Sequence, residues 1–254
     1  MRLYLIRHGQ SIDNFDMEYP GTYQVEDLYG DPELSDIGVS QARLLADFLA
    51  QPEPEKGLIP PPVRGVESSW RGGDVQDVEG FGITHVYSSP HIRAMATALT
   101  AASLLGIKPA VLEDLCEFQG NWTRDPHTQE IIGLPGPDRK YLAGRFPEFE
   151  FPDGFGEEPW WGGRTENSNQ CRDRAQRLIA ELLRRHSGTD NNVAAFTHSH
   201  FYNAFLFSLL EIPSDCGVWF AFNNAAITRI DFGDKETSLM YQNRVDFLPT
   251  ALIT

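Results

Sequence analysis

Three short segments with the character of strands, far apart in the sequence, each run directly into polar or cationic side chains. These segments, with the residues that follow them, are Leu3–Ile6 before Arg7-His8-Gly9, His85–Ser88 before Ser89-Pro90, and Val193–Thr197 before His198. Short runs that end in this way are typical of buried strands. Ligands of an open α/β sheet bind beyond the carboxyl ends of its strands, so the three ends are expected to meet at one site.

Segments with helical spacing alternate with these strands. Apolar residues recur at helical intervals from Asp36 to about Phe48, and again from about Asn167 to Arg185. Ser89 and Pro90 are expected to be the N-cap and the first residue of a third helix, which ends near Gly106. The alternation predicts an α/β fold with a mostly parallel central sheet and helices on both faces.

The length of 254 residues allows one large domain, and we expect residues 1–254 to form a single one. Residues 51–82 are rich in proline, glycine and charge, which predicts a surface insertion. Residues 118–165 are irregular but rich in aromatic side chains that a solvated linker would not carry, so we interpret them as a folded cap. The aromatic residues are Phe118, Trp122, Phe149, Phe151, Phe155, Trp160 and Trp161.

The chain is acidic, with 21 basic and 36 acidic residues and a formal net charge of −15. Such a surface repels nucleic acid and anionic membranes, so neither is expected as a partner. The sequence has no apolar run that could span a bilayer, and its first residues do not resemble a signal peptide. Its three scattered cysteines, Cys116, Cys171 and Cys216, form neither a disulfide framework nor a zinc cluster. We therefore expect a cytoplasmic protein.

A few residues of this acidic chain have the chemistry to bind and attack a phosphate. Arg93 falls in the first turn of the helix expected after Pro90, where the helix dipole and free backbone N–H groups favour an anion. Arg7, Arg93 and a cationic His198 would balance the roughly two negative charges of a phosphate monoester. A histidine can itself attack phosphorus while a backbone carbonyl fixes its second ring nitrogen. Glu117 would then protonate the leaving group.

The motifs around these residues occur in an order that resembles the histidine phosphatase superfamily, also called the phosphoglycerate mutase-like family. The set spans residues 1 to about 230, and as an ordered set it is far more specific than the Arg-His-Gly tripeptide alone. The matching segments are Arg7-His8-Gly9-Gln10-Ser11 with Asn14, Leu34–Ala42, Ser88–Thr97, Leu115-Cys116-Glu117 before Gly120-Asn121-Trp122, Thr197-His198-Ser199, and Asn224–Thr228.

The resemblance implies a role for each matching residue. His8 would be the nucleophile that forms a phosphohistidine, and Glu117 would act first as an acid and then as a base toward water. Arg7, Arg93 and His198 would hold the phosphoryl oxygens, with Asn14 and Ser199 as further phosphate-binding residues. The resemblance implies no metal and no other cofactor. It predicts a metal-independent phosphomonoesterase whose partner is a small phosphate monoester.

Two other functions remain open at this point. A phosphoglycerate mutase-type phosphotransferase would share the phosphate pocket but need a basic patch for a second anionic group, for which the candidates are Arg124, Arg139, Lys140, Arg145 and Arg164. A catalytically inactive phosphate-binding module would gain support if Glu117 pointed away from the pocket.

Individual residues also carry alternatives. His198 and His200 could begin a metal site, although no third ligand is evident. The Trp160-Trp161 pair could be packing within the cap or a platform for substrate. His91 is most simply a surface or capping residue. The sequence selects neither a particular substrate nor an oligomeric state.

Overall fold

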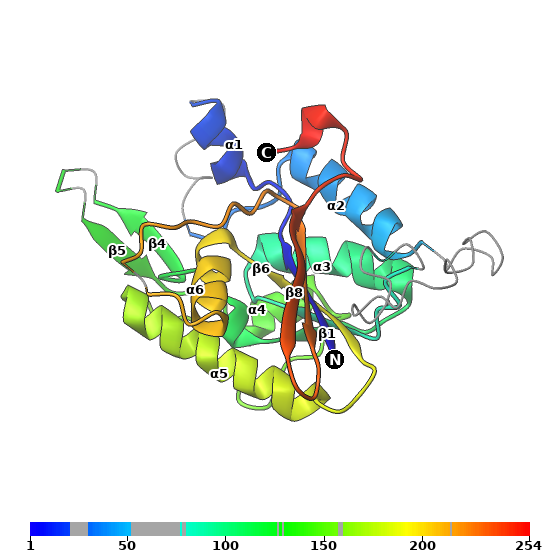
Figure 1. Cartoon of the computed structure of the whole chain (residues 1–254). Coiled ribbons are helices and arrows are strands. Elements are labelled where there is room, and N and C mark those ends of the chain that lie inside the picture. Colours follow the sequence, from blue (N-terminus) through cyan, green and yellow to red (C-terminus); the bar gives the residue numbers. More distant parts are fainter. Residues whose placement is uncertain are drawn as a thin grey trace, which may run out of the picture.

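The computed structural model describes residues 1–20, 30–51, 77, 80–125, 127–128, 130–156, 160–213 and 215–254. A six-stranded sheet in the order β3-β2-β6-β1-β7-β8 lies at its centre (Figure 1). The strands of this sheet are β1 (Arg2–Arg7), β2 (His85–Ser88), β3 (Ala110–Val111), β6 (Asn192–Thr197), β7 (Ile227–Phe232) and β8 (Thr237–Arg244). Neighbours from β3 to β1 pair in parallel, and β7 and β8 extend the sheet in antiparallel pairs. The predicted mostly parallel α/β fold is therefore confirmed.

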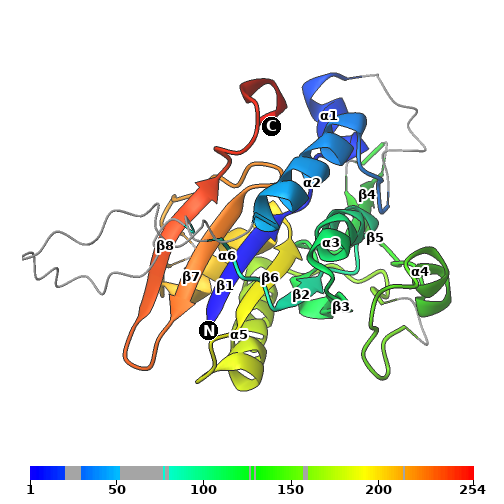
Figure 2. The ribbon, with the colours of Figure 1, turned by 90° about the vertical axis from the view of Figure 1, so that its right-hand side faces the viewer.

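Helices cover both faces of the sheet, as Figure 2 shows, with α2 and α3 in front and α5 and α6 behind. The helices of the chain are α1 (Ile12–Glu18), α2 (Asp36–Leu49), α3 (Ile92–Leu105), α4 (Arg139–Arg145), α5 (Ser168–His186) and α6 (Ser199–Leu209). The described residues also form two short 3-10 helices, η2 (Glu113–Leu115) and η3 (Thr250–Leu252), and a β4–β5 hairpin (Asn121–Arg124 and Ile131–Leu134).

The alternation of side chains along β1 explains why both faces need helices. Tyr4 and Ile6 pack into the core beneath α2 and α3, whereas Leu3 and Leu5 pack into the core beneath α5 and α6. Successive side chains of a strand point to opposite faces, so a run of four fully buried apolar residues must be covered on both. This burial holds the strand that leads into Arg7 and His8 at the centre of the sheet.

The aromatic residues of the 118–165 segment are part of the same core. Phe149, Phe155, Trp160 and Trp161 are buried in the cluster that also contains side chains of α2 and α3. We propose on this basis that the segment and the sheet form one domain. Most of the insertion expected at 51–82 lies outside the described residues, and of the described ones Asp77 and Phe81 are buried.

Helix α3 begins later than the sequence predicts. Its first residue is Ile92 and its N-cap is His91, so the expected start at Ser89 and Pro90 is wrong. The hydroxyl of Ser89 contacts two histidine rings, and the carboxylate of Asp31 accepts the N–H of Ile92, which a cap would otherwise satisfy. The remaining predicted helices agree to within a few residues.

Candidate active site

The carboxyl ends of three neighbouring strands bring the predicted residues together. Arg7 at the end of β1 pairs with Thr197 at the end of β6, and Ser88 of β2 pairs with Phe196. The N–H of His8 donates to the carbonyl of Thr197 over 3.1 Å. Because β6 lies between β1 and β2, the residues that follow all three strands share one edge of the sheet.

The chain after His8 is held tightly against the start of α2. A Cβ atom on Gly9 would lie 2.5 Å from the carbonyl oxygen of Gly38, and one on Gly38 would lie 1.9 Å from that of Gln10. Only glycine allows this approach. The side chain of Gln41 accepts the N–H of Gln10 over 2.7 Å, and Ser35 donates to the Gln10 side chain over 2.8 Å. The loop that carries His8 is therefore braced by the second motif of the sequence.

His8 is buried and its two ring nitrogens have different roles. Nδ1 lies 2.6 Å from the carbonyl oxygen of Gly9 and donates its proton there. Nε2 then carries a lone pair and accepts a 3.3 Å hydrogen bond from Nε of Arg93. Burial lowers the pKa of His8 well below its ordinary value, and the charges of Arg93 and Arg7 lower it further. The ring is neutral, with Nε2 as the nitrogen that can attack an electrophile.

Arg7 and Asn14 form the opposite side of the site. Arg7 donates from Nη1 to the carbonyl of Phe222 over 2.6 Å and from Nη2 to Oδ1 of Asn14 over 3.3 Å. Asn224 also donates to Oδ1 of Asn14, which leaves the amide nitrogen of Asn14 as the end that can donate to an anion. Burial lowers the pKa of Arg7 to about 10, so the guanidinium remains charged near neutral pH.

His198 is fully buried beside His8, with 5.0 Å between the ring centroids. Burial, followed by the charge of Arg93, lowers the pKa of His198 well below its ordinary value. The sequence-based expectation of a cationic His198 is therefore wrong, because desolvation and a nearby cation both oppose the charged ring. Its Nε2 lies 2.8 Å from Oγ of Ser89. If that hydroxyl donates, the proton of the ring is on Nδ1.

Nε of Arg7 and Nδ1 of His198 are buried and have no hydrogen-bond partner within the described part of the chain. Buried polar groups are normally paired, and leaving one unpaired costs about 1–3 kcal/mol. Arg7 precedes His8 in the chain, and the ring of His198 lies beside that of His8. An anion bound against His8 would satisfy both.

His91 is a third buried histidine, which the sequence did not assign to the site. Its ring lies 4.5 Å from that of His198 and 4.9 Å from that of Trp160, and its Nδ1 lies 3.1 Å from Oγ of Ser89. The expectation of a surface residue is wrong, because the side chain is fully buried. The capping alternative holds for its position, since His91 is the N-cap residue of α3, although its side chain makes no capping hydrogen bond. The buried Trp160 packs on it, in agreement with the packing interpretation of the Trp160-Trp161 pair.

Asp31 is a second residue that the motifs did not reveal. Its carboxylate accepts the N–H of Ile92 over 3.0 Å and lies 3.4 Å from Nη1 of Arg93. It therefore occupies the N-terminus of α3, where the sequence predicts an anion. Burial raises the pKa of Asp31 to about 7, although the charge of Arg93 acts in the opposite direction. A single acidic residue outside the motifs gives no signal of this placement in the sequence.

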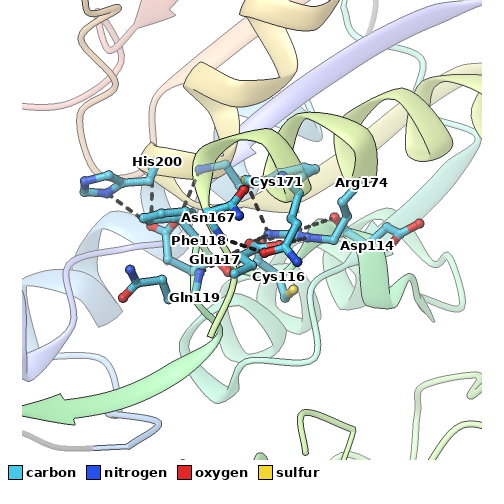
Figure 3. Close-up of polar contacts among 12 residues, drawn as sticks. Asp114, Cys116, Glu117, Phe118, Gln119, Asn167, Cys171, Arg174 and His200 are labelled. Atoms are coloured by element: carbon cyan, nitrogen blue, oxygen red, sulfur yellow. Dashed lines mark hydrogen bonds and ion pairs between the residues drawn. The ribbon is translucent and has the colours of Figure 1, made fainter. Parts of the chain in front are cut away.

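The Glu117 carboxylate lies at the N-terminus of α6, directly after His198 (Figure 3). Oε1 accepts the backbone N–H groups of Phe118 and Phe201 over 2.7 and 3.0 Å, and Oε2 accepts that of His200 over 3.4 Å. The carboxylate is close enough to Arg7 to raise the pKa of that guanidinium against the effect of burial. Glu117 is thus held beside the site.

Arg174 of α5 holds the segment that carries Glu117, as Figure 3 shows. Its Nη1 donates to the carbonyls of Asp114 and Cys116 over 2.8 and 2.7 Å, and its Nη2 donates to that of Glu117 over 3.3 Å. Glu166 balances the buried charge through a paired contact. The motifs assign no role to Arg174, because the carbonyl groups that it holds belong to residues nearly sixty positions away.

The described residues contain no group of three or more His, Cys, Asp or Glu side chains that could hold a metal ion. Cys116 and Cys171 are buried free thiols, and burial raises the pKa of Cys116 to about 12, which keeps it protonated and unreactive.

Ser199, the last of the expected phosphate-binding residues, is the first residue of α6 and is half-buried. No helix in the part of the chain that is described is long and apolar enough to cross a membrane.

The chain is similar to several solved phosphatase structures. The phosphoserine phosphatase of Entamoeba histolytica matches with 19% identity and a TM-score of 0.56 over 98% of this chain and 99% of that one. A mycobacterial glucosyl-3-phosphoglycerate phosphatase matches with 18% identity, a TM-score of 0.56 and the same coverage. The protein YhfR of Bacillus stearothermophilus has 18% identity and a TM-score of 0.57 over 97% and 98% of the two chains. At these identities the likeness concerns the fold.

A search of curated protein sequences found no match. The family model of the histidine phosphatase superfamily, branch 1, matches residues 75–244, which is well over half of the chain. The matched part contains Arg93, Glu117 and His198, and it starts after the strand that carries Arg7 and His8. That strand pairs with β6 and β7 inside the same sheet. The chain therefore belongs to the histidine phosphatase superfamily, branch 1.

Proposed function

We propose that the protein is a metal-independent phosphomonoesterase that hydrolyses a phosphate monoester through a phosphohistidine on His8. The observation that carries the proposal is the state of His8: a neutral ring with Nδ1 bound to Gly9 and Nε2 directed at Arg93. An unprotonated nitrogen among the donors of Arg7, Arg93 and His198 is the arrangement that attack on a phosphoryl group requires. The solved relatives that are named phosphatases agree with this chemistry.

In the first step Nε2 of His8 forms a bond to phosphorus, and the bond from phosphorus to the ester oxygen breaks. Protonated Glu117 gives its proton to that oxygen, and the alcohol leaves. Arg7, Arg93, Asn14 and His198 would donate hydrogen bonds to the phosphoryl oxygens as charge spreads over them.

In the second step Glu117, now a carboxylate, accepts a proton from a water molecule. The water oxygen bonds to phosphorus, and the bond from phosphorus to Nε2 breaks. The electron pair returns to His8, inorganic phosphate is released and Glu117 has regained its proton. The backbone N–H groups of Phe118 and Phe201 keep the Glu117 carboxylate in one position between the two steps.

The two alternatives draw less support from the site. A mutase needs a cationic surface for a second anionic group, but Arg145 pairs with Glu33 over 2.6 Å and Arg164 lies 4.5 Å over the ring of Trp161. An inactive binding module would have no use for an acid held beside the site, where Glu117 lies. The physiological partner we propose is accordingly a small phosphate monoester.

The test is hydrolysis of p-nitrophenyl phosphate by the wild type and by His8→Ala, both in excess EDTA. The wild type should turn over unaffected by the chelator. The variant should lose activity by about a thousand-fold or more, since the covalent nucleophile is gone. His127→Ala, which removes an exposed histidine, is the matched control.

Thermal unfolding of both variants checks that the fold is intact. Rapid acid quench with labelled substrate should trap phosphohistidine on the wild type only. A His8→Ala protein that keeps more than about a tenth of the wild-type rate would rule out the covalent mechanism. Loss of wild-type activity in EDTA would rule out the metal-independent part of the proposal.

A further inference from the structure

An exposed aromatic face borders the Glu117 side of the site. It is formed by Phe118, His200 and Trp219. The His200 ring lies edge-on to Trp219 at 5.0 Å between centroids and nearly parallel to Phe118 at 6.2 Å. Trp219 is 55% exposed and the side chain of His200 is 62% exposed. Exposed apolar surface of this kind marks a surface that contacts another molecule.

This face adjoins the candidate acid. Nδ1 of His200 lies 3.9 Å from Oε2 of Glu117, and Phe118 donates its N–H to the same carboxylate (Figure 3). The loop that carries Trp219 continues to Phe222, whose carbonyl accepts a hydrogen bond from Arg7. The aromatic face is therefore anchored to both Glu117 and Arg7. A group that receives a proton from Glu117 must leave past it.

The chemistry of the face selects one type of leaving group. Phe118, His200, Val218 and Trp219 offer two large apolar rings and an imidazole, with no arginine or lysine among them. The acidic Glu117 lies 3.9 Å from the His200 ring. An anionic leaving group would find no cation here, whereas a planar ring could stack on tryptophan or imidazole.

We propose that Phe118, His200 and Trp219 form the leaving-group subsite, and that the substrates of this protein are phosphate monoesters of a neutral aromatic or heteroaromatic group. The proposal rests on the proposed function only in placing the phosphoryl group against His8. Trp219 is a specificity-determining residue in this arrangement and takes no part in bond breaking.

The first experiment measures binding and needs no turnover. Calorimetry gives the Kd of benzylphosphonate and of ethylphosphonate for the wild type, Trp219→Ala, Trp219→Phe and Val218→Ala. In both ligands a methylene group stands in place of the ester oxygen. That methylene carries a phenyl ring in benzylphosphonate and a methyl group in ethylphosphonate, so the comparison measures the effect of the ring. Val218→Ala is the matched control, since Val218 is the exposed neighbour of Trp219.

The wild type should prefer benzylphosphonate, and Trp219→Ala should lower that preference about five-fold, the size of one lost aromatic contact. Trp219→Phe should keep most of the preference, Val218→Ala should keep all of it, and ethylphosphonate should bind the four proteins alike. An unchanged preference in Trp219→Ala overturns the subsite. An equal loss for both phosphonates also overturns it, because Trp219 would then support the phosphate pocket in general.

The second experiment compares kcat/KM for phenyl phosphate and β-glycerol phosphate in the same variants. Trp219→Ala should reduce kcat/KM for phenyl phosphate only. Failure of the proposed function is a different result: no variant, including the wild type, would turn over either ester, while the binding experiment would still decide the subsite. A wild type that hydrolyses β-glycerol phosphate better than phenyl phosphate overturns the substrate class.

Discussion

Protonation in the site follows from how deeply each residue is buried. His8, His91 and His198 are all fully enclosed, and desolvation is the first cause that lowers the pKa of each ring. Neutral histidines suit their proposed roles, since a nucleophile needs a lone pair and a neutral ring can still donate one hydrogen bond to phosphate. The positive charge that attracts the substrate then falls to Arg7 and Arg93.

The buried carboxyl group of Asp31 predicts a dependence of stability on pH. Burial raises its pKa from 3.8 to about 7, and the carboxylates of Glu33 and Asp13 add to the effect, whereas Arg93 and the N–H of Ile92 lower it. Between about pH 4 and 7 the folded protein therefore holds a proton that the unfolded chain has lost, so stability falls as the pH rises through this range. Asp31→Asn removes this dependence.

The measurement is urea unfolding of the wild type and Asp31→Asn at pH 5 and pH 8. The free energy of unfolding of Asp31→Asn minus that of the wild type should be larger at pH 8 than at pH 5. A difference that is smaller at pH 8 than at pH 5 would show that the ion pair with Arg93 outweighs burial and keeps Asp31 charged in the fold. Asp47→Asn, a change in an exposed acid of α2, controls for the general effect of removing an acid.

At the scale of elements, the outer strands are tied to the centre of the sheet by a buried polar cluster. Asp77 accepts hydrogen bonds from Tyr4 of β1 over 2.7 Å and from Tyr241 of β8 over 2.6 Å, and it pairs with Arg229 of β7 over 2.8 Å. Asp77 and Arg229 are almost inaccessible to solvent. Three strands therefore share one carboxylate, contributed by the segment expected to be an insertion.

Asp77→Ala should destabilise the fold by about 3–5 kcal/mol, because it leaves the buried Arg229 with Asp231 as its remaining paired carboxylate and removes the acceptor of two buried hydroxyl groups. The effect is measured as the free energy of unfolding in urea. Asp246→Ala is the matched control: it removes an exposed partner of Arg244 and should cost less than about 1 kcal/mol. Equal losses in the two variants would contradict the prediction.

The starts of the helices show how far element boundaries follow from sequence. Helix α5 begins where its sequence indicates, because Asn167 and Gln170 form a capping box from local side chains alone. Helix α3 does not, because Ser89 is engaged by His198, which follows the distant strand β6, and Asp31 provides the cap instead. A local signal failed where a long-range partner competed for the same side chain.

At the scale of the molecule, the segment after β8 supports the site. Gln41 of α2 accepts the N–H of Gln10 and donates to the carbonyl of Leu252 and to Oγ1 of Thr254. Thr254 in turn contacts Asn224, which donates to the carbonyl of His8. The segment after β8 thus braces the loop that holds the nucleophile, as its position beside α2 in Figure 1 suggests.

Deletion of residues 252–254 should lower kcat/KM for p-nitrophenyl phosphate by about ten-fold, because small displacements of a nucleophile are costly. The melting temperature should change little, since the side chains of this segment lie outside the buried core. Ile253→Ser, which changes an exposed side chain and keeps the backbone contacts, should behave as the wild type. An equal loss in Ile253→Ser, or an unchanged rate after the deletion, would contradict the bracing role.

The α/β fold, the family and the residues that follow β1, β2 and β6 can be predicted from the amino-acid sequence, because apolar runs, helical spacing and ordered motifs are local properties of the chain. The charge of His198, the roles of Asp31, His91 and Arg174, and the contact of Glu117 with α6 emerge only from the folded chain. Each of these depends on burial or on a hydrogen bond to a residue distant in sequence. Desolvation and such contacts exist only once the strands and helices have packed.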